Sequence, residues 1–185
     1  MDETRLLNTS PEHMSQFEQA LHEIGSVLER MRDDDIERAT EMIASANTIV
    51  AYGCGRESLQ IQGLVMRLYH LGLRASMQGA MTTPPLGPGD LFLCSAGPGE
   101  LSTVTALMRV ARAAGARILF LTAEPGCDAA RLADQVLTVP AQTMARDMGG
   151  SSTLPMGSVY EGALFVLFEI LVLRLRDRLG ETSET

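Results

Sequence analysis

The sequence is poor in cysteine and in basic residues. Its three cysteines, Cys54, Cys94 and Cys127, form no CxxC pair and cannot all be joined in disulfides within one chain. They favour a reducing compartment and give no zinc-binding pattern. Fifteen Lys and Arg residues against 23 Asp and Glu leave a net charge of −8. This charge argues against nucleic acid as a partner.

The sequence also lacks an apolar run long enough to cross a membrane. The most apolar segment, 163–173, is interrupted by Glu169 and is shorter than the roughly 20 residues that a spanning helix needs. We interpret it as a buried helix and expect no membrane association. The first residues, MDETRLLNTSPEH, carry acidic side chains where a secretory signal is basic. We therefore expect a cytoplasmic protein.

Strand and helix patterns alternate from residue 47 onward. Apolar runs that end in turn residues precede segments of helical spacing, and they read TIVAYG, DLFLCSAGPGE and ARILFLTAEPG. The helical segment after the third run is CDAARLAD, a last strand QVLTVP follows, and LRASMQG adds a further strand. This alternation predicts an α/β fold, a three-layer sandwich around a parallel sheet of about five strands. Two helices precede it, so we divide the chain into a helical extension (1–46) and an α/β domain (47–185).

Ligands of such sheets bind beyond the carboxyl ends of the strands, where helix N-termini gather. The candidate loops are therefore Gly53–Ser58, Ser95–Ser102, Thr122–Cys127 and Ala141–Ser158.

The turn Gly53-Cys54-Gly55 is a weak match to a dinucleotide-binding motif. Ser58 stands where the third glycine is needed, and the next strand ends in the neutral Gln78 rather than in an acid for the ribose. We therefore predict neither a nicotinamide nor a flavin cofactor.

Five motifs taken in order carry a more specific resemblance, which covers nearly the whole chain. They are YGCGRESL, MRLYHLG, TTPPLGPGD, SAGPGE and LPMGSVYEG. Their arrangement resembles the sugar isomerase (SIS) domain, and most closely the 6-phospho-3-hexuloisomerases. The resemblance implies a flavodoxin-like sandwich whose subunits form a homo-oligomer, a tetramer or dimer, with active sites completed across subunit boundaries. It also implies isomerisation between an aldose phosphate and its ketose through an enediol, without metal or other cofactor.

By this resemblance Glu161 is the base that carries a proton between neighbouring carbons, and His70 is a candidate to assist ring opening or proton transfer. Each residue has a structural alternative. Ser158 and Glu161 fit the S-x-x-E capping box, in which the glutamate bonds back to the start of its helix. His70 lies just before Gly72, a C-cap position where a cation is favourable without any catalysis.

The expected phosphate site departs from the family pattern. The isomerases usually carry Ser after the GxGR turn and SGSG followed by Thr in the second loop. Glu57 stands at the serine position, and Ala96, Pro98 and Leu101 stand at the hydroxyl positions. The candidate substrate-binding residues are Gly53, Gly55, Arg56, Glu57, Ser58, Ser95, Gly97, Gly99 and Ser102.

We expect an isomerase whose small-molecule substrate is a sugar phosphate or a related unphosphorylated or differently substituted sugar. The alternative is a non-catalytic regulatory module that binds such a sugar. The long apolar helix that follows Ser158 is the predicted association surface of the oligomer, because a helix apolar on nearly all faces needs more cover than one chain gives.

Overall fold

A parallel five-stranded sheet forms the centre of the molecule. The computed structural model describes residues 14–143 and 152–180. All neighbouring strands are parallel, in the order β2-β1-β3-β4-β5. The strands are β1 (Ile49–Gly53), β2 (Ala75–Met77), β3 (Leu91–Ser95), β4 (Arg117–Thr122) and β5 (Gln135–Thr138). The predicted parallel sheet is confirmed.

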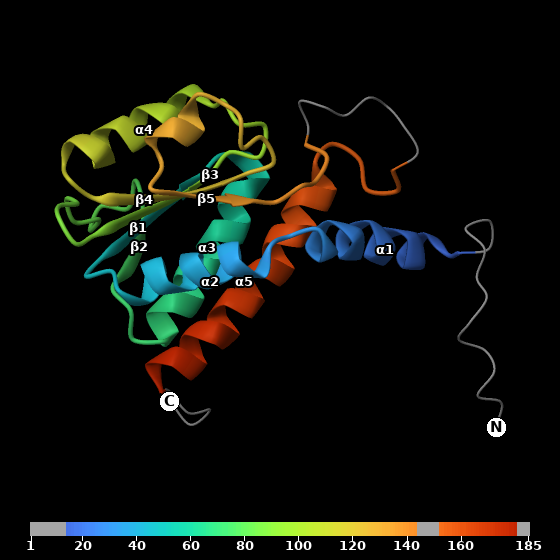
Figure 1. Ribbon diagram of the computed structural model, residues 1–185, viewed down its shortest axis with the longest axis horizontal. Helices are drawn as coiled ribbons and strands as arrows, with labels where there is room; N and C mark the ends of the chain where they lie inside the picture. Colours follow the sequence, from blue (N-terminus) through green and yellow to red (C-terminus); the bar gives the residue numbers. More distant parts are fainter. Residues whose placement is uncertain (1–13, 144–151, 181–185) are drawn as a thin grey trace.

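The described residues form five α-helices. They are α1 (Gln16–Glu29), α2 (Asp33–Ala44), α3 (Gly55–His70), α4 (Ser102–Ala113) and α5 (Ser158–Leu179). Of these, α2, α3, α4 and α5 cover the two faces of the sheet (Figure 1). The three-layer α/β sandwich expected from the sequence is confirmed. Figure 1 shows α4 on one side of the sheet and α2, α3 and α5 on the other.

A hydrophobic core lies on each face of the sheet, and alternate residues of the strands point into one core or the other. In β3, Leu91 and Leu93 pack with side chains from α1, α2, α3 and α5. Phe92 and Cys94 point to the opposite face and pack with α4 residues such as Met108. Since both faces of each central strand are covered, the strands read as continuous apolar runs.

The predicted helix CDAARLAD is wrong as an α-helix. Only Ala129–Leu132 is helical there, as a single 3-10 turn. A segment this short has too few residues to extend an α-helix beyond its costly first turn. Asp134 then leads into β5, and its carboxylate accepts a hydrogen bond from the Ile118 amide of β4 at 2.8 Å.

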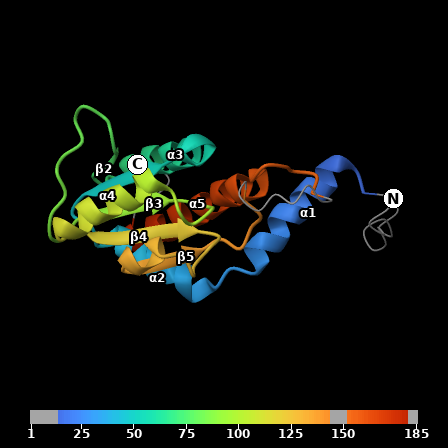
Figure 2. The same cartoon turned by 90° about the horizontal axis from the view of Figure 1, so that it is seen from above.

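The first helix, α1, fixes the segment that leads into α5. The Glu23 carboxylate accepts hydrogen bonds from the Thr153 amide at 2.6 Å and from the Ser152 hydroxyl at 2.9 Å. Gly162 permits the close approach of the two helices, because a Cβ there would lie 2.7 Å from Ile24 Cδ1. Figure 2 shows α1 running past the start of α5 and beyond the sheet. The helix thus supports one wall of the pocket described below.

The last helix, α5, is apolar on most of its circumference. Leu164, Phe168 and Leu171 are buried against the sheet and α3, whereas Phe165 and Leu173 are exposed. None of the described helices is both long enough and apolar enough to cross a membrane. The role of α5 as the association surface of an oligomer stays a prediction.

Candidate active site

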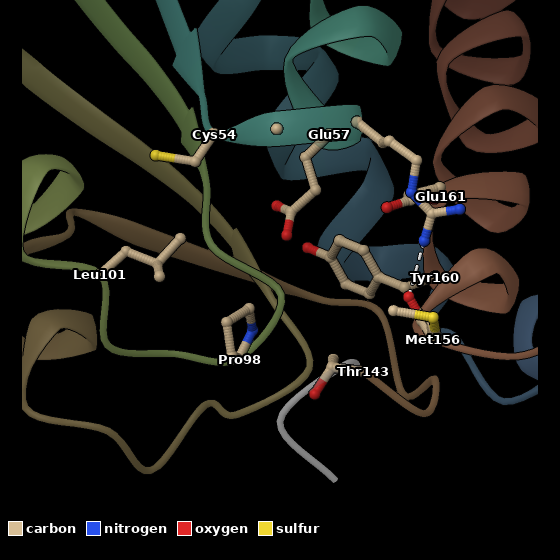
Figure 3. Close-up of a pocket in the computed structure, with 11 residues that line it drawn as sticks. Cys54, Glu57, Pro98, Leu101, Thr143, Met156, Tyr160 and Glu161 are labelled. Carbon is tan, nitrogen blue, oxygen red and sulfur yellow. Dashed lines mark hydrogen bonds and ion pairs between the residues drawn. The ribbon is translucent and has the colours of Figure 1, made fainter. Parts of the chain in front are cut away.

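A pocket of about 370 Å³ opens at the carboxyl ends of β1 and β3. The chain leaves β1 toward β2 on one side and resumes at β3 on the other, so this is the point where strand order reverses. Figure 3 shows the side chains around it. The lining residues are Cys54, Gly55, Arg56, Glu57, Pro98, Leu101, Thr143, Met156, Gly157, Tyr160 and Glu161.

Three helices begin at this pocket. The residues just before α3, α4 and α5 are Cys54, Leu101 and Gly157, and all three line it. None of the three makes a side-chain capping bond to its helix. Because the first amides of a helix lack partners within it and carry partial positive charge, the three helix starts favour an anionic group in the pocket.

Glu161 lies in the first turn of α5 and is held by Arg56 of α3. The Arg56 Nε lies 3.1 Å from Glu161 Oε2, and the side chain of Glu161 is 16% exposed. The same guanidinium donates to the Ser158 hydroxyl at 3.1 Å and to the Met156 carbonyl at 2.6 Å. Arg56 therefore joins the start of α3 to the start of α5.

The capping-box alternative for Ser158 and Glu161 is wrong. The N-cap of α5 is Gly157, in left-handed conformation, and Ser158 is already the first residue of the helix. The Ser158 hydroxyl accepts a hydrogen bond from Arg56. The Glu161 carboxylate faces the pocket and Arg56 instead of the backbone of its own helix start.

Burial raises the pKa of Glu161 above its ordinary value, Arg56 lowers it, and the negative charge of Glu57 raises it again. The net direction is upward. A carboxylate whose pKa is raised toward neutrality is a better proton acceptor than an ordinary exposed one. Glu161 thus has the position and the electrostatic environment of a general base.

Glu57 points into the pocket from the first turn of α3 and is held by the loop after β3. The Ser95 hydroxyl donates to Glu57 Oε2 at 2.5 Å, and the Gly97 amide donates to both carboxylate oxygens at 3.1 Å. The buried Tyr160 hydroxyl lies 3.1 Å from Ser95 Oγ and extends this chain. Burial raises the pKa of Glu57, and its hydrogen bonds with Ser95 and Gly97 partly offset the rise.

Part of the predicted site comes together. Of the predicted residues, Gly55, Arg56, Glu57 and Glu161 line the pocket. Ser95 and Gly97 reach it through their bonds with Glu57.

Four predicted binding residues do not line this pocket. Gly53 is the end of β1, where a Cβ would lie 2.9 Å from Ile61 Cδ1. Ser58 accepts a hydrogen bond from the Gln62 side chain along α3. Gly99 faces Glu124 and Cys127, and Ser102 is exposed at the start of α4.

His70 does not reach the pocket within its own chain. It is the last residue of α3 and is exposed, whereas the pocket lies at the first turn of that helix. His70 lies 13 positions after Glu57 in α3, which corresponds to about 20 Å along the helix axis. Any part that His70 takes in the chemistry of this pocket therefore needs a second copy of the chain.

Sequence reasoning missed Tyr160 and Thr143. Tyr160 directly precedes Glu161 in an apolar helix, and no local pattern marks its hydroxyl as part of the site. Thr143 is buried and lines the pocket, and its hydroxyl has no hydrogen-bond partner in the described part of the chain. Thr143 lies in the predicted loop 141–158, of which residues 144–151 lie outside the described residues.

Comparisons with known proteins agree with this fold. No protein-family model matches the chain. The chain is 32% identical over 162 residues to the 3-hexulose-6-phosphate isomerase of Mycobacterium gastri, covering 88% of this chain and 81% of that protein. It is 28% identical over 166 residues to the 3-hexulose-6-phosphate isomerase of Bacillus subtilis strain 168, covering 89% and 90%.

A crystal structure from Methanococcus jannaschii, for which a 3-hexulose-6-phosphate isomerase function was inferred, superposes with a TM-score of 0.79 at 21% identity, covering 92% of this chain and 94% of that chain. This likeness confirms the fold. The sequence relatives place the molecule in the class of sugar-phosphate isomerases. The chain belongs to the sugar isomerase (SIS) family, close to the 3-hexulose-6-phosphate isomerases.

Proposed function

We propose that this sugar-phosphate isomerase moves a carbonyl group between neighbouring carbons of a hexulose 6-phosphate, with Glu161 as the base. The observation that carries the proposal is the position of Glu161. Its carboxylate faces the pocket at the start of α5, is held by Arg56 and does not cap its own helix. A structural glutamate at this position would be satisfied by its helix start.

The names of the relatives define the chemistry of the proposed substrate. A 3-hexulose has its carbonyl at the third carbon, so a shift to either neighbour gives another ketose. We therefore propose a ketose–ketose pair in place of the aldose–ketose pair expected from the sequence. Both types of reaction pass through an enediol, which lies between the first and second carbons for an aldose–ketose pair and between the second and third carbons for 2- and 3-ketoses.

The proposed reaction needs one base and a site that stabilises negative charge. The Glu161 carboxylate takes the proton from the carbon next to the carbonyl, and the C–H electrons form the carbon–carbon double bond of the enediol. The carbonyl oxygen becomes negative and takes a proton. Loss of the proton from the neighbouring hydroxyl and return of the proton from Glu161 to the former carbonyl carbon complete the shift. The starts of α3, α4 and α5 supply positive potential for the negative oxygen.

Conversion of a sugar phosphate tests the proposal against the regulatory alternative. The full chain is incubated with 3-hexulose 6-phosphate, with 2-ketose and aldose 6-phosphates of six carbons, and with the unphosphorylated sugars. Products are followed by NMR. Interconversion of the two ketose phosphates supports the proposal. Binding of a sugar phosphate without conversion of any compound overturns it in favour of the regulatory module.

A further inference from the structure

We infer that the Glu57 carboxylate occupies the anion-binding part of the pocket, competes there with the phosphate of the substrate, and so determines how tightly phosphorylated substrates bind. The inference rests on the proposed function only in taking the substrate to carry a phosphate. It makes Glu57 a specificity-determining residue of the same pocket.

The groups that hold Glu57 are the groups that an anionic ligand would use. The Ser95 hydroxyl and the Gly97 amide both donate to its carboxylate, at 2.5 and 3.1 Å. A hydroxyl and a loop amide at the end of a central strand, close to helix starts, are strong donors for carboxylate or phosphate oxygens alike. While the Glu57 carboxylate accepts hydrogen bonds from Ser95 and Gly97, these two donors are not available to a phosphate.

The fit of Glu57 on the loop is close. A Cβ added at Gly97 would lie 3.1 Å from Glu57 Oε1 and 3.1 Å from a ring carbon of Tyr160. The carboxylate therefore rests directly on the loop backbone, with Tyr160 beside it. A phosphate and the Glu57 carboxylate cannot share this space, so one has to leave for the other to bind.

The charges in the pocket also set Glu57 against a bound phosphate. Arg56 is the one cationic side chain among the described residues that line it. Its guanidinium is already engaged by Glu161, Ser158 and the Met156 carbonyl. A phosphate that approaches the Ser95 and Gly97 donors thus meets the like charge of Glu57 with no uncommitted cation among these lining residues to balance it.

The pocket also holds a hydroxyl that no group in the described part of the chain uses. The Thr143 hydroxyl lines the pocket, is 3% exposed as a residue, and has no partner in the described part of the chain. Buried hydroxyls are rarely left without a partner, so this group indicates that a ligand completes the pocket. The pocket is thus suited to a polar ligand, and Glu57 occupies two of its donors.

Binding of inorganic sulfate tests the competition without any catalysis. Sulfate keeps its charge between pH 5 and 8 and is titrated calorimetrically into the wild type, Glu57→Ser and a control, Glu29→Ser. Glu29 is exposed at the end of α1, so the control makes the same change in net charge away from the pocket. We expect Glu57→Ser to bind sulfate about tenfold more tightly than the wild type, and Glu29→Ser to match the wild type.

A second variant guards against a folding defect. Glu57→Gln keeps the shape of the side chain and removes its charge, so it is expected to bind sulfate more tightly than the wild type as well. Thermal unfolding of each variant shows which of them are folded. Wild-type sulfate affinity in the folded variants, or a gain in Glu29→Ser as large as in Glu57→Ser, overturns the inference.

Kinetics then separate the role of Glu57 from the proposed reaction. In Glu57→Ser we expect KM for the sugar phosphate to fall about tenfold. KM for the unphosphorylated sugar is expected to stay unchanged. A raised KM for the phosphate overturns the inference, because Glu57 would then help to bind the substrate. Tighter sulfate binding in variants that isomerise nothing would support the inference and contradict the proposed function.

Discussion

Glu57 and Glu161 enter the same pocket from the first turns of two different helices, and they differ in what holds them. Glu161 faces a cation, Arg56, and is partly open to the pocket. Glu57 faces a hydroxyl and a backbone amide, with no cation among its hydrogen-bond partners in the described chain. Burial raises the pKa of both groups.

On the proposed function, this difference gives the two carboxylates of one pocket two tasks. A base has to be ionised and free to meet a carbon-bound proton, which suits the carboxylate beside Arg56. A carboxylate whose oxygens already accept hydrogen bonds from Ser95 and Gly97 is bound like a ligand. Environment rather than residue type thus separates the two roles. The following changes test that separation.

Replacing the base is expected to have the largest effect. Glu161→Gln keeps the side-chain shape and removes its ability to accept a proton, so kcat for isomerisation should fall by about 10²- to 10⁴-fold. The melting temperature should change little, since Glu161 makes no cap. The matched control is Glu169→Gln on the same helix, where the half-exposed carboxylate lies 3.3 Å from Arg67. A near-normal kcat in Glu161→Gln would show that Glu161 is not the base and would contradict the separate roles of Glu57 and Glu161.

A second comparison is between the two ends of α3. The first turn carries Glu57 into the pocket, whereas His70 at the last turn does not reach the pocket of its own chain. If a homo-oligomer brings His70 to the pocket of a neighbouring copy, His70→Gln should lower kcat by about tenfold or more. Co-refolding His70→Gln with Glu161→Gln should then restore activity, because some sites combine an intact Glu161 with an intact His70. Full activity of His70→Gln alone would leave His70 with its structural role in the last turn of α3.

The pH dependence of kcat/KM is expected to shift in opposite directions when the two neighbours of Glu161 lose their charge. The base works deprotonated, so activity falls as pH drops through its pKa. Arg56→Met removes a positive charge, raises the pKa of Glu161 and should move the acid limb to higher pH. Glu57→Gln removes a negative charge, lowers the pKa of Glu161 and should move the limb to lower pH.

Rate profiles of the three proteins between pH 4 and 8 measure these shifts. Tyr160 interacts with Glu57 and with Cys94. Burial raises the pKa of both Tyr160 and Cys94 well above their ordinary values, so they stay neutral across this range. If the acid limbs of the kcat/KM profiles coincide in all three proteins, Glu161 is not the group whose titration sets the activity.

The smallest effect is expected at Thr143. Thr143→Val keeps the shape of the side chain and removes the unpartnered hydroxyl. If this hydroxyl binds the substrate, KM should rise about three- to tenfold, as for the loss of one hydrogen bond. The ligand-free protein should be as stable as the wild type or slightly more so, because an unsatisfied buried group is gone. Thermal unfolding with and without the sugar phosphate separates the two effects.

The sheet and its helices could be predicted because their signals are local. Continuous apolar runs such as those around Val50 and Phe92 ended in glycine-containing turns and were followed by helical spacing. The 3-10 turn after Cys127 could not be told from a short α-helix, because four residues fit either pattern. Strand order at the sheet centre then placed the pocket where such folds bind ligands.

The contacts inside the pocket could not be predicted, because they join distant parts of the chain. Ser158 and Glu161 satisfied a local capping pattern, yet the Ser158 hydroxyl accepts from Arg56, which is 102 positions away. Glu57 was recognised as a departure from the expected serine. That its carboxylate is bound by Ser95 and Gly97 depends on how β1 and β3 pair, which the sequence alone does not specify.

Exchange of the carbon-bound hydrogen with solvent tests the central claim most directly. The wild type and Glu161→Gln are incubated with the hexulose 6-phosphate in deuterated water, and deuterium at the carbons beside the carbonyl is followed by NMR. We expect the wild type to incorporate deuterium and Glu161→Gln, folded and still able to bind the sugar phosphate, to incorporate essentially none. Incorporation by Glu161→Gln at the wild-type rate would show that another group carries the proton.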